Sequence, residues 1–262
     1  MSLRKHGRAV LLGMLLIGAL PASAFGSGHP AQSENVRTRN ACVIIDNDFD
    51  IDDMMAIPLV LGSRHVAAIV QSEGYTLPGE GAAAVNQLVN GARTNRKIPI
   101  IVGGRQAESP SPERWPWLSF FRSMMKVSNG LMAVREQPWP ENLDYTNKVQ
   151  DAVSGCRKVS VLVIGTYTSF NHYIPLIKDK VDRVVIMGQP IGDISRTPGR
   201  ESFNCDFDLK ACELAMVQLR ELDAYFVDIP RFEDCHDRAD PPGYCYMLRP
   251  ARLYSFKELC FV

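Results

Sequence analysis

The sequence predicts an α/β fold with an open, mostly parallel sheet flanked by helices. Between residues 42 and 228, short apolar runs alternate with longer segments whose apolar residues recur at helical spacing. Such alternation is typical of βαβ units, whose crossover helices cover both faces of a parallel sheet. The 262 residues, 46% of them hydrophobic, are enough for one domain with a sizeable core. We therefore expect a single domain over residues 41–262.

The apolar runs indicate the strands, and the segments between them indicate the helices. In chain order, the expected strands are 42–46 (CVIID), 66–72 (VAAIVQS), 98–103 (IPIIVG), 159–165 (VSVLVIG), 182–187 (DRVVIM) and 223–228 (DAYFVD). The expected helices, each a longer segment of helical period, are 52–63, 80–95, 147–156, 169–179 and 208–221. Ligands of such sheets bind beyond the carboxyl ends of the strands, so residues that directly follow a strand are the first candidates for a site.

Two stretches interrupt this alternation. Residues 104–146 form a long connection with the segments SPSPERWPWLSFF and QPWPEN, whose prolines exclude a continuous helix and whose tryptophans supply flat apolar surface. An active-site lid and ordinary surface packing both remain open for it. Residues 229–262 show no clear period and contain three of the seven cysteines, which predicts an irregular tail.

The N-terminus resembles an export signal. Residues 1–24 combine a basic start, an apolar stretch and the small residues Ala22-Ser23-Ala24. The apolar stretch is shorter than the roughly 20 residues that span a bilayer. We expect a cleaved signal peptide, a polar linker over residues 25–40, and a periplasmic or secreted protein without membrane attachment after cleavage.

The composition narrows the classes of molecule that the protein is expected to bind. Lysine plus arginine equals aspartate plus glutamate at 29 each, without long blocks of one sign, which argues against nucleic acid and anionic membranes. The expected partner is a small molecule, and a homo-oligomer remains open. Seven cysteines, none at zinc-finger spacing, can form disulfides after export in a pattern that the sequence leaves open. Cys42, within an apolar strand, is expected to be a small buried hydrophobe.

The stretch IIDNDFDIDD (44–53) carries five aspartates in eight positions between two apolar segments. Asp46 and Asp48 point to the same side of the first strand, and Asp52 and Asp53 fall in the first helical turn, where the helix dipole favours anions. Two carboxylates ~5 Å apart repel each other by roughly 3 kcal/mol at an effective dielectric constant of ~20. The cluster therefore predicts a bound cation or a shared proton, and ligands that are all oxygen favour calcium or magnesium.

Two other interpretations compete with a metal site. A solvent-facing cluster at the helix N-terminus accounts for Asp52 and Asp53 but leaves Asp46 and Asp48 unexplained. A phosphatase of the haloacid dehalogenase type would use Asp46-x-Asp48 as nucleophile and acid, but that pattern prefers threonine or valine where this chain has Asp50. An EF-hand loop is excluded, because DNDFDIDD lacks the glycine and the glutamate that such a loop requires.

The segment DNDFDIDDMMAI (46–57) resembles the N-terminal signature of the nucleoside hydrolase family of the inosine/uridine-preferring type, D-x-D-P-G-x-D-D-A-x-A-I. Further segments follow in family order, so that the resemblance covers roughly residues 42–228. They are IPIIVGG (98–104), similar to P-V-x-x-G; VLVIGTYTSF (161–170), similar to G-P-L-T-N; VVIMGQ (184–189), similar to M-G-G; and TPGRESFNCDFDLKAC (197–212), similar to T-P-x-x-E-F-N followed by D-P-E-A-A. The resemblance implies a Rossmann-like core and calcium-dependent hydrolysis of the N-glycosidic bond of ribonucleosides.

Residue roles are carried over by motif position. The resemblance implies that Asp48 binds calcium and is the catalytic base that takes a proton from the attacking water. Its other implied calcium ligands are Asp53 and the Thr168 backbone carbonyl, with Asp46 as a support behind the metal. Carboxylates around a hard cation that activates water suit such hydrolysis.

The implied substrate is a ribonucleoside or a related riboside. Its ribose hydroxyls would be held by Asp52, and the far side of the sugar by Glu201 and Asn204. Compared with the family pattern, one extra residue, Ser202, stands between Glu201 and Phe203-Asn204. Phe49-Asp50 replaces the Pro-Gly of the signature, so the turn must form without glycine.

The C-terminus departs most from the family pattern, in which a histidine-aspartate pair well beyond the last matching strand completes the site. His236-Asp237 has the right residue types, but His236 comes only eight positions after Asp228. Without a replacement the leaving base lacks an acid, so the alternative is a catalytically inactive nucleoside- or sugar-binding protein or a truncated relic of the same fold. His172 is expected to be an ordinary surface or core histidine.

Overall fold

A computed structural model of the chain describes residues 41–92, 97–105, 115–134, 143–187, 202–228 and 252–255, all within one compact unit, Val36–Val262. The strands are β1 (Ala41–Asn47), β2 (Val66–Gln71), β3 (Ile100–Val102), β4 (Lys158–Val163), β5 (Val181–Met187), β6 (Ala224–Asp228) and β7 (Arg252–Ser255). The helices are α1 (Ile51–Ser63), α2 (Pro78–Gly91), α3 (Leu118–Ser128), α4 (Tyr145–Ala152), α5 (Thr168–Ile177), the 3-10 helix η2 (Lys178–Lys180), α6 (Phe203–Asp206) and α7 (Leu209–Leu219). The expected signal peptide and linker lie outside the described residues. None of the described helices is long and apolar enough to cross a bilayer.

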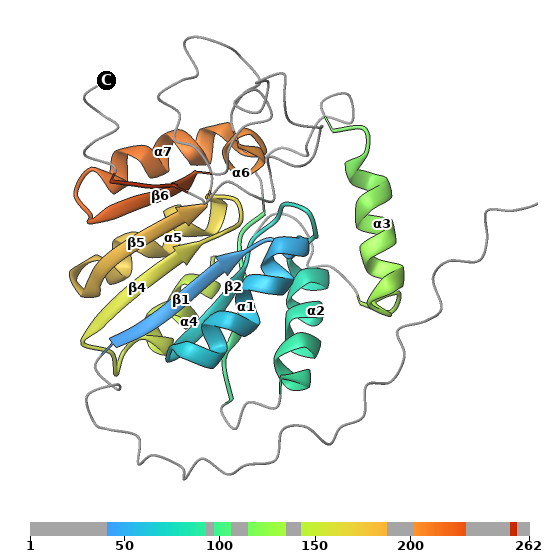
Figure 1. Cartoon of the computed structure of the whole chain (residues 1–262), viewed down its shortest axis with the longest axis horizontal. Coiled ribbons are helices and arrows are strands. Elements are labelled where there is room, and N and C mark those ends of the chain that lie inside the picture. The colour runs from blue at the N-terminus through green and yellow to red at the C-terminus, as the bar shows by residue number, and fades with distance from the viewer. Residues whose placement is uncertain are drawn as a thin grey trace, which may run out of the picture. The chain divides into compact units, whose positions relative to one another are not determined.

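The described strands form one open sheet in the order β3-β2-β1-β4-β5-β6-β7, with β1 between β2 and β4 (Figure 1). Strands β1 to β6 are parallel, and β7 pairs antiparallel with β6. Asp46 on β1 is level with Val70 on β2 and Val163 on β4. The register therefore brings the carboxyl ends of these three strands to the same edge. The open, mostly parallel sheet expected from the sequence is confirmed.

Side-chain alternation along β1 divides the core into two layers. Cys42 and Ile44 belong to a hydrophobic cluster with residues of α4, α5 and α7, whereas Ile45 belongs to a cluster with residues of α1, α2 and α3. Successive side chains of a strand point to opposite faces, so the sheet is covered on both sides. Strands buried on both faces are nearly continuous apolar runs, which is why they are recognisable in the sequence.

Every predicted strand and helix is present, with ends that differ by a few residues. Helix α3, α6 and β7 lie outside the predicted set. Helix α3 begins two residues after Pro116 and contains no proline, so it is compatible with the prolines of the long connection. Strand β7 lies in the segment expected to be irregular, and it is held by pairing with β6. Four residues are too few to show a strand period.

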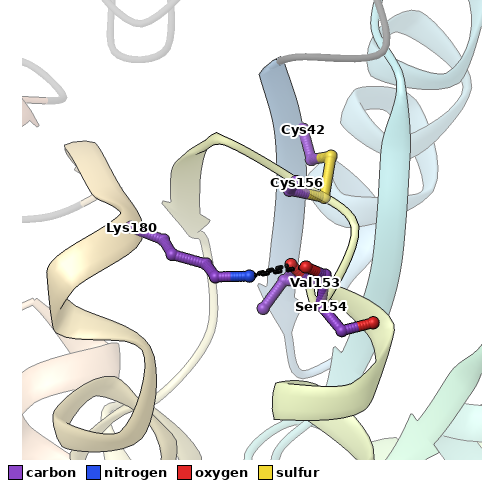
Figure 2. Close-up of a disulfide and its surroundings, with 5 residues drawn as sticks. All are labelled: Cys42, Val153, Ser154, Cys156 and Lys180. Carbon is purple, nitrogen blue, oxygen red and sulfur yellow. Dashed lines mark hydrogen bonds between the residues drawn. A yellow bond between two sulfur atoms is a disulfide. The ribbon is translucent and has the colours of Figure 1, made fainter.

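A disulfide joins Cys42 of β1 to Cys156, which lies two residues before β4 (Figure 2). The two Cα atoms lie 5.9 Å apart although 114 positions separate the residues. The expectation that Cys42 is a plain buried hydrophobe is therefore wrong, because pairing of β1 with β4 brings two distant cysteines together.

Lys180 donates hydrogen bonds to the carbonyl oxygens of Val153 (2.9 Å) and Ser154 (2.7 Å), at the end of α4 where the helix dipole favours a cation.

Candidate active site at the carboxyl end of strand β1

The candidate site lies where the strand order of the sheet reverses. From β1 the chain moves to β2 and β3 on one side, and it later continues with β4 on the other side of β1. Open α/β sheets bind ligands at such a switch point. Gly165, just after β4, packs so closely on the end of β1 that a Cβ there would lie 2.6 Å from the Asp48 nitrogen. The aspartate-rich turn and the β4–α5 turn therefore meet at this point.

Two of the aspartates close the turn between β1 and α1. Asp50 is the N-cap of α1 and accepts a hydrogen bond from the Ile51 N–H (2.6 Å). Asp53 Oδ2 accepts hydrogen bonds from the N–H groups of Asp50 (2.9 Å) and Asp48 (3.2 Å). Asp50 and Asp53 thus form a capping box. Asp53 is fully buried, so the interpretation of a merely solvent-facing N-terminal cluster is wrong for this residue.

Phe49 makes this turn without glycine. Its φ of 60° lies in the left-handed region, which costs a non-glycine residue about 1–2 kcal/mol. Its ring is buried in the core cluster that contains Ile57 of α1, Met125 of α3 and Leu131. Burial of an aromatic side chain offsets a cost of this size. Core packing of Phe49 therefore stabilises this turn, in place of the Pro-Gly of the family signature.

Asp48 is held by the β2–α2 loop (residues 72–77). Its Oδ2 accepts a hydrogen bond from the Tyr75 N–H (2.8 Å), and its carbonyl oxygen accepts hydrogen bonds from the N–H (3.1 Å) and the hydroxyl (2.8 Å) of Thr76. Gly74 lies directly against the carboxylate, since a Cβ at position 74 would be 1.9 Å from Oδ2. Asp48 is 1% exposed. The loop therefore fixes the position of this carboxylate.

Asp46 is also fully buried, at the end of β1 beside α5. Its Oδ1 accepts a hydrogen bond from the Ser72 hydroxyl (2.6 Å), a second hydrogen bond (2.6 Å) joins the hydroxyls of Ser72 and Ser169, and Ser169 Oγ accepts one from the Gly104 N–H (2.7 Å). This chain of bonds connects β1, the β2–α2 loop, the end of β3 and α5. Asp46 therefore connects the end of β1 to the β2–α2 loop and, through Ser72, to α5.

Burial controls the electrostatics of the cluster. It raises the pKa of Asp46 and of Asp48 to about 7 and that of Asp50 to about 6. Burial also raises the pKa of Asp52, and it raises that of Asp53 well above the usual value, with a further contribution from the charge of Asp48. A buried carboxylate resists ionisation unless a positive group compensates it. Protons or a cation must therefore balance this cluster.

Within the aspartate cluster, Asp53 Oδ1 is a buried carboxylate oxygen without a hydrogen-bond partner, whereas the Asp46 carboxyl lies beside the Tyr173 hydroxyl. Buried acceptors are normally paired, so an orphaned oxygen on Asp53, whose other oxygen bonds the Asp48 amide, fits a cation ligand. Across the described residues, however, no group of three His, Cys, Asp or Glu side chains is placed to hold a metal ion. The Asp48–Asp53 pair therefore fits a cation when other oxygens, such as backbone carbonyls or ligand hydroxyls, complete the ligand set.

The remaining predicted site residues lie around the same edge where the structure describes them. Thr168 is the first residue of α5, and its hydroxyl donates a hydrogen bond to Asp208 Oδ2 (2.7 Å) at the N-cap of α7. Asn204 of α6 is buried, and its Nδ2 donates a hydrogen bond to the Ile164 carbonyl (2.8 Å) beyond β4. Asp52 is partly exposed in the first turn of α1.

Three sequence-derived candidates, Glu201, His236 and Asp237, lie outside the described residues. His172 is exposed on α5, one turn after Thr168, and its Nδ1 shares a hydrogen bond with the Tyr145 hydroxyl of α4. It has the surface position expected for a histidine without a catalytic role.

A second disulfide lies next to Asn204. It joins Cys205 of α6 to Cys212 of α7, and both cysteines are fully buried. Helix α6 has only four residues, and so short a helix has little stability of its own. The covalent link to α7 therefore contributes to the position of Asn204.

Aromatic rings gather beside the carboxylates. Ring centroids lie 4.4 Å apart for Tyr75 and Phe203, 4.9 Å for Tyr75 and Phe121, and 5.4 Å for Tyr75 and Trp117. Trp115 lies 5.0 Å from Phe203. We call these five residues the aromatic cluster. Because the Tyr75 N–H bonds the Asp48 carboxylate, the cluster begins directly at the site, and Trp115 and Trp117 of the long connection belong to it.

Sequence reasoning does not single out the ionic contacts of the β2–α2 loop. Glu73, 2% exposed in its side chain, pairs with Arg122 of α3 (3.3 Å) and with Arg105 (3.4 Å). The acidic residue at the end of an apolar strand is a local signal that a partner is needed. The identity of that partner, 49 positions later for Arg122, leaves no local pattern.

Solved structures with a similar fold include nucleoside hydrolases. The inosine-uridine preferring enzyme from Bacillus anthracis matches with a TM-score of 0.52 and 15% identity, over 76% of this chain and 70% of that one. A plant nucleoside hydrolase (TM-score 0.52, 21% identity) and a purine-preferring ribonucleoside hydrolase from Gardnerella vaginalis (TM-score 0.51, 19% identity) each match over 72% of this chain and 60% of theirs. This chain thus spans 60–70% of the length of these structures. A search of curated proteins found no match.

The family assignment comes from the sequence itself. The profile described as Inosine-uridine preferring nucleoside hydrolase matches residues 43–229, the part of the chain that runs from β1 to β6. This range agrees with the resemblance seen in the motifs over roughly 42–228, and it contains all the described residues of the candidate site. The chain belongs to the inosine-uridine preferring nucleoside hydrolase family.

Proposed function

We propose that the protein hydrolyses the N-glycosidic bond of ribonucleosides and depends on calcium for this reaction. One observation carries the proposal: in a chain of this family, Asp48 and Asp53 are buried together at the switch point of the sheet, and Asp53 keeps an unpartnered carboxylate oxygen. A buried pair of carboxylates that lacks donors on one side suits a hard cation.

The residues of the site divide the work. Asp48, held in place by Tyr75 and Thr76, accepts a proton from the water that attacks the sugar. Asp53 and Asp48 hold calcium together with the Thr168 carbonyl, and Asp46 supports them from behind. When bound, calcium supplies positive charge that acidifies water and orients the ribose hydroxyls.

Substrate recognition falls to the three residues that the family resemblance assigns to the sugar. Asp52 accepts hydrogen bonds from the ribose hydroxyls, and Asn204 and Glu201 hold the far side of the sugar. The aromatic cluster offers flat rings beside Asp48 against which a planar nucleobase packs. The carboxylates of the aspartate cluster stabilise the positive charge that develops on the sugar during bond cleavage.

The test is hydrolysis of inosine, uridine and a p-nitrophenyl riboside, with calcium and with a chelator. We expect turnover that requires calcium and is lost in Asp48→Asn, which keeps the shape of the side chain and removes the base. Retained turnover in Asp48→Asn would show that the base is assigned wrongly. Nucleoside binding without turnover in the wild type would favour the alternative, a binding protein of the same fold.

We further propose that the protein is exported, on the basis of the basic, apolar and small-residue segments of residues 1–24. Export also suits the two disulfides, which form in oxidising compartments. N-terminal sequencing of the protein purified from its native host should give a start near Phe25. A start at Met1 in a reducing compartment would refute export.

A further inference from the structure

We propose that Arg122 is a positioning residue for the site: its guanidinium holds the β2–α2 loop, and through that loop the carboxylate of Asp48. The role of this carboxylate in hydrolysis rests on the proposed function, whereas the mechanical connection rests on contacts alone. Helix α3, which carries Arg122, would then help to position the Asp48 carboxylate rather than only cover the sheet.

The first link joins the loop to Asp48. Tyr75 and Thr76 donate three hydrogen bonds to this residue, one to Oδ2 and two to its carbonyl oxygen. Gly74 lies against the carboxylate itself. A shift of the loop by a fraction of an ångström therefore moves the carboxylate or breaks its hydrogen bond to Tyr75, because close-packed groups cannot move independently.

The second link joins the loop to Arg122. The guanidinium donates from Nε (3.2 Å) and from one terminal nitrogen (2.6 Å) to the Gly74 carbonyl, and the same terminal nitrogen lies 3.3 Å from Glu73 Oε1. Its flat face lies 5.8 Å from the ring centroid of Phe207, between α6 and α7. These contacts orient a planar fork from three sides, which an ammonium group cannot reproduce.

The buried charge of Glu73 explains why the β2–α2 loop needs the contact with Arg122. Glu73 is almost fully buried, so loss of a cationic partner leaves charge poorly compensated in the protein interior. Arg105 is the second cationic partner of the Glu73 carboxylate (3.4 Å), so Arg122 shares this charge. The Glu73 backbone is held separately: its N–H donates to the Gly104 carbonyl (2.9 Å), and its carbonyl accepts from the Thr166 hydroxyl (2.6 Å). Arg122 alone among the described side chains is bonded to the Gly74 carbonyl, the group that directly precedes the Tyr75 N–H.

The chain offers a matched control on the same helix. Lys126 lies one turn beyond Arg122 on α3 and forms an ion pair with Glu80 of α2. Lys126→Met therefore removes a charged contact between α3 and the body of the protein without touching the β2–α2 loop. Arg122→Met removes the contacts between this side chain and the β2–α2 loop. Arg122→Lys keeps the positive charge but loses the planar guanidinium.

The direct test is amide hydrogen exchange at Tyr75 and Thr76, whose N–H groups bond Asp48. We expect exchange at least about tenfold faster in Arg122→Met and Arg122→Lys, and unchanged in Lys126→Met, since protection follows the free energy of local opening. Equal exchange in wild type and both Arg122 variants would overturn the proposal. If Arg122→Met does not fold, Arg122→Lys carries the test.

The kinetic test separates positioning from general stability. With a nucleoside substrate, we expect kcat to fall about 10- to 100-fold in Arg122→Lys while KM stays within about twofold, because misplacement of a reacting group slows the chemical step. Lys126→Met should keep both constants. A wild type without turnover would defeat the proposed function but leave the exchange test intact. Faster exchange with unchanged kcat in an active protein would show that Arg122 has only a structural role.

Discussion

The backbone of Gly74 lies against the side chain of Asp48, so closely that a Cβ at position 74 would be 1.9 Å from Oδ2 and 2.6 Å from Cγ. The loop after β2 and the turn after β1 therefore form one packed unit. Neither can rearrange without the other, and the site depends on a residue that carries no functional group.

Gly74→Ala should displace the Asp48 carboxylate and reduce hydrolysis at least about tenfold, because the new methyl group occupies its position. Gly62→Ala is the control, since a Cβ there meets nothing within 4 Å and alanine favours the helix by about 0.5–1 kcal/mol. The measurements are kcat/KM and the thermal midpoint of both variants. Full activity in Gly74→Ala would show that Asp48 is not held as described.

Calcium should raise the thermal midpoint of the protein, because binding to the folded state alone stabilises it by mass action. Asp53→Asn should lose most of this calcium shift, because it removes the charge from the buried carboxylate with the unpartnered oxygen. Asp50→Asn should keep it, since asparagine serves as well as aspartate at an N-cap. Equal calcium shifts in all three proteins would refute the metal role of Asp53.

The metal-free protein should become less stable as pH rises from about 4 to about 7. Burial raises the pKa of Asp46 to about 7, so in this window the folded state keeps a proton that the unfolded chain has lost. The stabilisation is present below the unfolded pKa and is lost as pH rises through the folded one, with an upper bound of about 4 kcal/mol for this residue.

Asp46→Asn replaces the protonated acid by a neutral group of the same shape and should make this decline shallower, while the raised pKa values of Asp48 and Asp50 keep part of it. Denaturant unfolding in chelator at several pH values measures the effect. A variant with the same decline as the wild type would exclude Asp46 as its source.

Trp117→Ala should weaken nucleoside binding, with KM raised about 5- to 50-fold, because the ring belongs to the aromatic cluster and is still 38% exposed to a ligand. Phe120→Ala is the control on the same helix: this ring is 74% exposed and belongs to no described ring contact, so both kinetic constants should persist. A base-free riboside should show a smaller change than inosine in Trp117→Ala. Equal effects of the two variants would argue against stacking.

The two disulfides should have different consequences. Loss of Cys42–Cys156, which closes a loop of 114 residues, should lower the free energy of unfolding by about 4–5 kcal/mol on chain-entropy grounds, with the site unchanged in structure. Loss of Cys205–Cys212, seven positions apart, should cost less, about 2–3 kcal/mol, but should raise KM through Asn204. Paired Cys→Ser variants, compared by unfolding and by kinetics, test both. A KM change confined to the Cys42–Cys156 variant would contradict this assignment.

Much of the fold was predictable because its signals are local. Each buried strand is an apolar run of its own, and each covering helix repeats its apolar residues at helical spacing. The place of the site was predictable for a related reason: the aspartates follow the first strand, and the carboxyl ends of parallel strands share one edge. The exposure of α1 was not, because Met55 and Leu59 belong to an apolar segment yet are 68% and 73% exposed.

The sequence by itself determined the order of strands and helices, the family and the position of the aspartate cluster, since these depend on neighbours in the chain. Only the tertiary structure decided which distant residues meet there: Cys42 with Cys156, Tyr75 with Phe203, and Arg122 with Gly74. Such contacts follow from strand pairing and helix packing across the whole sheet, and no spacing within a segment encodes them. For this reason the carboxylates were predictable from sequence, whereas the loop and the arginine that hold them in place were not.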